Sequence, residues 1–138
     1  PGHQFASLHI EFPAETDPLK AHDVIDTIEN DFLKKDHLQV TIHYDPIVTS
    51  DAAVGVLRAR LLEHARQLDP QLSVHDLRIV PGDSHTNVLF DLVFPAGYTG
   101  DKDQMLADMC SFVTAQNPKY SCVVKVEQSY ASALPDKK

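Results

Sequence analysis

The feature that most constrains the fold is a change of hydrophobic period within the first 45 residues. Apolar and polar residues alternate over 5–12, apolar residues recur at helical spacing over 18–35, and alternation returns over 38–45. A period of two is typical of a half-buried strand, and a period near 3.6 is typical of an amphipathic helix. A strand, a helix and a strand of these lengths predict a right-handed crossover connection.

The helix of this crossover is expected to cover one face of the two strands. Its predicted apolar stripe comprises Leu19, Ala21, Val24, Ile25, Ile28 and Phe32. The strand face beneath it is predicted to carry Leu8, Ile10, Val40 and Ile42. Since side chains alternate between the two faces of a strand, His9, His43 and Asp45 are expected to share the face without a helix.

The rest of the chain predicts a helix, two strands, a helix and a strand. These elements are expected at residues 49–68, 72–80, 86–94, 101–116 and 120–130. The tripeptide Phe-Pro-Ala occurs at 12–14 and again at 94–96, which indicates a divergent internal repeat in which Phe12 corresponds to Phe94.

The repeat divides the chain into two modules and a tail. We expect the C-terminal part of a first module at 1–48, reduced to its last three elements. A second, degenerate helix–strand–strand–helix–strand module is expected at 49–131, and a disordered polar tail at 132–138. The chain is thus expected to begin in the middle of its first module.

Composition excludes several classes of function. The chain carries 12 Lys and Arg against 20 Asp and Glu, so its net charge of -8 repels phosphate backbones and nucleic-acid binding is not expected. No apolar stretch approaches the roughly 20 residues that span a bilayer, so neither a transmembrane helix nor membrane insertion is predicted for this segment. Cys110 and Cys122 lie in apolar segments and are expected to be buried thiols.

Histidines and carboxylates on the first two strands suggest a metal site. His43 and Asp45 are separated by one residue, so their Cβ atoms lie about 7 Å apart on one face. Imidazole and carboxylate suit zinc, cobalt, nickel or ferrous iron better than calcium. His9 lies on the same face, whereas His22 belongs to the helix and would have to reach across a dimer or around a strand end. The alternative is a solvated polar surface.

Three histidine-centred segments give the first module a family resemblance. FASLHIE contains His9, LKAHDVIDTIE contains His22, and VTIHYDP contains His43 and Asp45. In this order they resemble the cytoplasmic C-terminal domain of cation diffusion facilitator transporters, which are divalent metal/proton antiporters. The second module repeats the start of the family pattern in LSVHDLR and SHTNVLFD.

The resemblance implies an α+β fold of ferredoxin-like, metallochaperone-like modules that pair as a homodimer. The domain would lie at the cytoplasmic face of the cell membrane, attached to the transmembrane part of its own transporter. In several family members it binds the divalent cation at the dimer interface. Zinc is the commonest substrate of the family, and cobalt, iron, manganese or nickel are alternatives. The positions that match family ligands are His9, His22, His43 and Asp45.

The second module departs from this pattern. In the repeat, the positions of His9, His43 and Asp45 are taken by Asp91, Lys125 and Glu127. A charged lysine cannot ligate zinc, so Lys125 is expected to pair with Asp91 or Glu127. His75, Asp91 and His85 stay as secondary metal candidates.

We therefore expect a non-catalytic, metal-sensing and dimerisation domain of a divalent cation efflux transporter. One alternative is a structural or small-molecule-binding ferredoxin-like domain in which the histidines are incidental. A hydrolase built on His43-Tyr44-Asp45, with Glu11 as base, is disfavoured because the sequence has no nucleophile motif and no phosphate-binding glycine loop among its five glycines.

Overall fold

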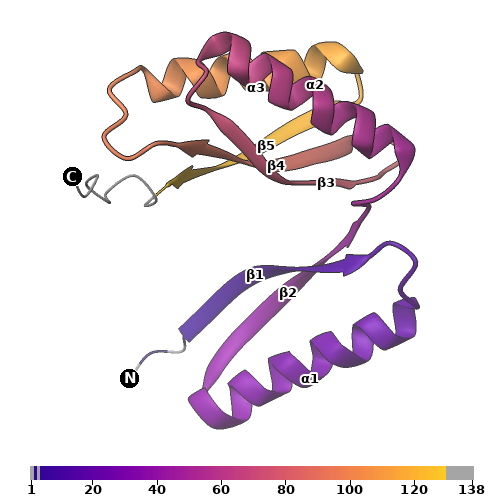
Figure 1. Ribbon diagram of the computed structural model, residues 1–138. Helices are drawn as coiled ribbons and strands as arrows, with labels where there is room; N and C mark the ends of the chain where they lie inside the picture. The colour runs from indigo at the N-terminus through magenta and orange to yellow at the C-terminus, as the bar shows by residue number, and fades with distance from the viewer. Residues whose placement is uncertain (1, 3, 130–138) are drawn as a thin grey trace, which may run out of the picture. The chain divides into compact units, whose positions relative to one another are not determined.

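The computed structural model describes residues 2 and 4–129 and shows an α+β protein (Figure 1). The order of helices and strands is the one predicted, and it is compatible with a ferredoxin-like fold. The chain divides into two compact units, Pro1–Ile47 and Val48–Lys138. The tail at 132–138 lies outside the described residues. No helix in the described part of the chain is long and apolar enough to cross a membrane.

The first unit is a strand–helix–strand crossover. It comprises β1 (Gln4–Pro13), α1 (Pro18–Asp36) and β2 (Leu38–Ile47). The two strands pair in parallel, with Gln4 opposite Leu38 and Pro13 opposite Ile47. Asp17 begins the helix, because its side chain accepts hydrogen bonds from the backbone N–H groups of the first turn, one of them at 2.9 Å.

The hydrophobic core of the first unit is small. The helix α1 packs against β2 and makes few contacts with β1. Ala21 and Val40 are the buried apolar residues in the described part of this unit. The predicted stripe of α1 is partly wrong, because Leu19 is 81% exposed and Val24 is 44% exposed. In the described part of the first unit, one helix lies along the two-stranded sheet, so no second helix of this unit packs against the flanks of its apolar stripe (Figure 1).

The second unit is a three-stranded sheet with two helices on one face (Figure 1). Its elements are α2 (Ala52–Leu68), β3 (Ser73–Val80), β4 (Thr86–Phe94), α3 (Lys102–Gln116) and β5 (Tyr120–Gln128). The sheet order is β3-β4-β5, in which β4 pairs antiparallel with β3 and parallel with β5. The central strand β4 therefore lies beneath both helices.

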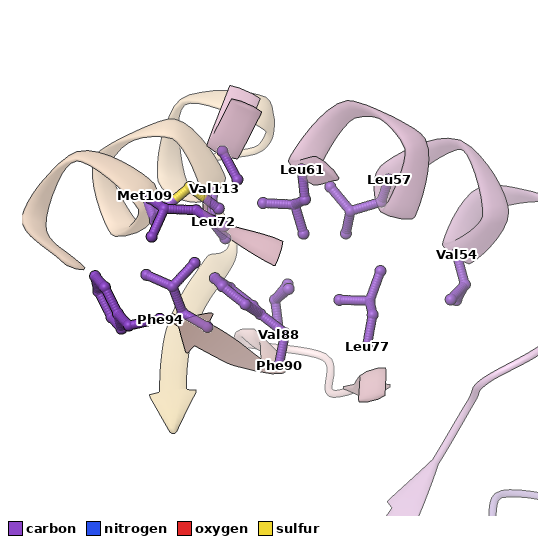
Figure 2. Packing of buried hydrophobic residues seen from close by; sticks show 12 residues of the cluster. Val54, Leu57, Leu61, Leu72, Leu77, Val88, Phe90, Phe94, Met109 and Val113 are labelled. Atoms are coloured by element: carbon purple, nitrogen blue, oxygen red, sulfur yellow. The ribbon is translucent and has the colours of Figure 1, made fainter. Parts of the chain in front are cut away.

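The main core of the protein lies between this sheet and its helices (Figure 2). Alternate residues of β4 point into it and meet the predicted stripe of α2 and the inner face of α3. The buried residues are Val54, Leu57, Leu61, Ala65, Leu72, Leu77, Val88, Phe90, Leu92, Phe94, Met109 and Val113. Because a fully buried aliphatic or aromatic side chain contributes about 1.5–3 kcal/mol, most of the stability resides in the second unit.

The pairing of the strands reproduces the internal repeat. The strand β1 begins at Gln4 and β4 at Thr86, while their parallel partners β2 and β5 begin at Leu38 and Tyr120. Gln4 and Thr86 are separated by the same number of residues as Phe12 and Phe94, and so are Leu38 and Tyr120. The parallel strand pairs of the two units therefore have the same register. In the described residues, no helix or strand before β1 corresponds to α2 and β3.

Candidate functional site

The strand register of the first unit brings three of the four predicted ligands together. His9 on β1 lies directly opposite His43 on β2, and Asp45 follows two residues later on the same face. Asp45 Oδ2 lies 2.9 Å from His9 Nδ1. The His9 and His43 rings stack, with centroids 4.9 Å apart and planes at 18°. These residues alternate with buried Val40, so they lie on the sheet face opposite α1, as expected.

The hydrogen bond between His9 and Asp45 determines which nitrogen of His9 is available. An ionised carboxylate only accepts hydrogen bonds, so His9 Nδ1 carries the proton and donates it. In the neutral form of the ring, His9 Nε2 is then the nitrogen that carries the lone pair, and the His9 side chain is 64% exposed. A histidine that binds a metal through one nitrogen commonly donates the other N–H to a carboxylate. The pair therefore has the donor chemistry of a metal-binding histidine and its orienting carboxylate.

The geometry of the cluster is incomplete as a metal site within one chain. Among the described residues, no group of three or more His, Cys, Asp or Glu side chains is arranged to hold a metal ion. The lone pair of an imidazole nitrogen lies in the plane of its ring. The His9 and His43 rings are stacked and nearly parallel, so their lone pairs do not point at one cation between the rings. A cation would need a rotation of one ring and further ligands.

His22 does not join this cluster within the first unit. It is an exposed residue of α1, the helix that packs against β2 over the face of Val40. The two-stranded sheet therefore lies between His22 and the pair formed by His9 and His43. The structure thus brings together three of the predicted ligands and leaves the fourth on the other side of the sheet.

Glu29 of α1 has a structural role that sequence reasoning missed. Its Oε1 accepts a hydrogen bond of 2.8 Å from the backbone N–H of Ile42 on β2. β1 occupies the other edge of β2. Glu29 therefore satisfies a donor on the outer edge of β2, which discourages another strand from pairing there. No hydrophobic period marks such a contact, because it depends on how the helix lies over the strand.

The corresponding face of the second unit has a different charge pattern. Asp91 on β4 lies between His75 on β3 and Lys125 on β5. It is 4% exposed, and burial, together with the nearby Glu127, raises the pKa of its carboxyl group above the ordinary value. Lys125 Nζ lies 2.7 Å from Glu127 Oε1, one of the two pairings predicted, and this contact raises the pKa of Lys125. An ammonium group thus stands where the first unit has His43.

The secondary metal candidates are not all close together. His75 is the direct neighbour of Asp91 across the strand pair, and its Nε2 lies 3.1 Å from the hydroxyl of Ser73. His85 precedes β4 at the other end of the hairpin, where Ser84 Oγ lies 2.9 Å from its Nδ1. The strand β4 separates His85 from Asp91 by about 20 Å, given its rise of about 3.3 Å per residue.

A bulge in β3 also escaped prediction. The pairing register shifts between His75 and Arg78, and Asp76 adopts a left-handed backbone conformation with φ of 49°. Asp tolerates this conformation better than most residues with a side chain, and an extra residue in a strand re-aims its neighbours. Because no glycine occupies this position, no local pattern marks the irregularity.

Comparison with known proteins gives a match, and it covers the first unit. Residues 1–47 match the family model described as "Cation efflux protein, cytoplasmic domain". The match ends at Ile47, where the first compact unit also ends. No curated protein and no solved structure gives a match. The resemblance seen in the sequence is therefore confirmed over residues 1–47, which match the model of the cytoplasmic domain of cation efflux proteins.

Proposed function

We propose that this chain is the regulatory, metal-sensing and dimerisation domain of a divalent cation efflux transporter, at the cytoplasmic face of the membrane. The family match over residues 1–47 supports the class of protein. The single observation that favours sensing is the cluster of His9, His43 and Asp45 on the sheet face without a helix. Zinc is the first cation to test, because imidazole and carboxylate donors suit it.

In the proposed site, His9 and His43 are the donors that face the cation. Asp45 holds the proton on His9 Nδ1 and so keeps Nε2 as the free donor nitrogen. Zinc prefers four ligands, and two imidazoles from one chain do not complete such a shell. We therefore propose that a second copy of the chain supplies the missing ligands, with His22 as the candidate. This proposal accounts for a family ligand that lies on the other side of the sheet.

A shared site couples the cation to association. Bound cation would offset the negative charge that this acidic chain brings to a dimer interface. A ligand shifts an equilibrium only through its differential affinity for the two states, so a site completed by two copies favours the dimer. The imidazoles must be neutral to bind, hence cation affinity should fall as the solution becomes acidic.

One observation favours the alternative of a structural or small-molecule-binding domain. The His9 ring is already engaged by Asp45 on one nitrogen and stacked on His43, and this arrangement needs no ion. In that case the histidines would be part of a polar surface, and cations would change neither association nor melting temperature.

A calorimetric zinc titration at neutral pH tests the proposal. The whole chain is compared with His43→Ala/Asp45→Ala and with Lys125→Ala/Glu127→Ala, which alters the corresponding positions of the second unit. Micromolar or tighter binding by the chain and the second variant, lost in the first variant, supports the proposed site. Equal binding by all three proteins places the metal elsewhere, and no binding by any of them supports the structural alternative.

A further inference from the structure

We propose that Cys110 and Cys122 are a site of oxidative modification, where a reversible disulfide joins α3 to β5 within one chain. The oxidant is of the hydrogen peroxide class. This site lies in the second unit and is independent of the proposed metal function of the first.

The positions of the two sulfur atoms support this proposal. Cys110 Sγ lies 2.6 Å from Cys122 Sγ, and both cysteines are free thiols that are half-buried. The sulfur atoms of a disulfide are about 2.05 Å apart, so only a small movement separates contact from bond. The helix α3 packs directly against β5, which holds the two residues in this relation.

The internal repeat shows that packing alone does not require this pair. In the repeat, Cys110 corresponds to Ile28 on α1 and Cys122 to Val40 on β2. The first unit therefore has two branched aliphatic side chains at the equivalent positions of its helix and strand. The second unit has two thiols at these positions. Two thiols can form a disulfide, which the isoleucine and valine of the first unit cannot.

The local environment sets the order of the reaction. Burial, and then the contact with Cys110, raises the pKa of the Cys122 thiol well above its ordinary value. A thiol that holds its proton more tightly is the poorer nucleophile, so we assign the first attack on the oxidant to Cys110.

The reaction balances in two steps. Cys110 Sγ attacks one peroxide oxygen, so that an S–O bond forms, the O–O bond breaks, and the released hydroxide takes up the proton lost by Cys110 as water. Cys122 Sγ then attacks the sulfenic sulfur, so that the S–S bond forms and the S–O bond breaks. The departing hydroxide takes the Cys122 proton as a second water. The two thiols together lose two electrons, and the peroxide gains them.

The disulfide would close a short loop near the end of the second unit. It would span residues 110–122, from the last turns of α3 through the Asn117-Pro118 turn into β5. Such a link restricts the unfolded chain, so the oxidised second unit should melt at a higher temperature than the reduced one.

The test is native oxidation of the reduced chain with a small excess of hydrogen peroxide, followed by thiol counting and peptide mapping by mass spectrometry. The matched control is C110I/C122V, which copies the residues of the first unit and retains an apolar contact. We expect both free thiols to disappear with a loss of two hydrogens. A 110–122 cross-link that a reductant reverses and a rise in Tm absent from the control should accompany this loss.

Several results would overturn the proposal. One is that both thiols stay free in the native chain under conditions that oxidise them after denaturation. Another is that oxidation produces disulfides between chains, or sulfinic and sulfonic acids on one cysteine without the internal cross-link. The C122V single variant separates the steps, because it should trap Cys110 as a sulfenic acid. If it takes up no oxygen, the assignment of Cys110 as the attacking residue is wrong.

Discussion

The two phenylalanines of the repeated Phe-Pro-Ala segment provide a matched perturbation of the two units. Phe94 is fully buried, and its ring lies 4.9 Å from that of Tyr98. Phe12 holds the corresponding position in the first unit, where it is half-buried and packs at 5.5 Å against Tyr44. Replacing each residue with alanine removes the same atoms from two different environments.

The structure predicts unequal costs for these substitutions. Removing a buried phenylalanine costs about 3–5 kcal/mol, since the lost transfer energy is joined by the cost of a cavity. Phe94→Ala should fall in this range. A half-buried ring loses roughly half of its transfer energy and leaves no closed cavity, so Phe12→Ala should cost about 1 kcal/mol. The difference of about 2 kcal/mol or more corresponds to roughly 30-fold in an opening equilibrium.

Hydrogen exchange measured by mass spectrometry can separate the two units. Each compact unit opens cooperatively, so the exchange of its peptides reports the free energy of its unfolding. This free energy is measured on peptides of β1 and β2 for Phe12→Ala and on peptides of β4 and β5 for Phe94→Ala. Phe94→Leu is the control for loss of the ring alone. Equal costs for the two alanine variants, or a larger cost for Phe12→Ala, would refute the conclusion that the first unit has a small hydrophobic core and a partly exposed helix.

Two further predictions concern the second unit. Asp91→Asn should stabilise the protein at neutral pH by on the order of 1 kcal/mol, because it removes an ionised carboxylate whose pKa burial has raised. This gain should shrink as pH falls through the raised pKa and vanish below about 3.9, as thermal melts over a pH series would show. Asp51→Ala should cost about 1 kcal/mol in urea unfolding, because Asp51 Oδ1 accepts a 2.7 Å bond from Val54 N at the start of α2.

Much of the fold could be predicted from local patterns. Local sequence patterns predicted the order of the helices and strands in the described residues, because the faces and ends of these elements are encoded within a few residues. The repeated Phe-Pro-Ala segment related the strands of the two units, and β1 and β4 share one register with their parallel partners. Successive side chains of a strand point to opposite faces of the sheet. The positions of His9, His43 and Asp45 along their strands therefore predicted that they share one face.

The remaining features depend on contacts between elements. The α1 stripe was wrong at Leu19 and Val24, because periodicity marks apolar residues without showing whether a second helix will cover them. Cys110 and Cys122 were expected to be buried thiols, but they are half-buried and in contact, which depends on how α3 lies on β5. Similarly, no local pattern reveals the bulge at Asp76.

In the proposed function, a cation bound near His9, His43 and Asp45 draws two chains together. Sedimentation velocity at one protein concentration, with zinc and then with excess chelator, measures this most directly. We expect zinc to raise the dimer fraction and the chelator to reverse the change. The His43→Ala/Asp45→Ala variant should lose this response, and the Lys125→Ala/Glu127→Ala variant should retain it. Sedimentation that zinc does not alter, or an equal zinc response in the His43→Ala/Asp45→Ala variant, would contradict it.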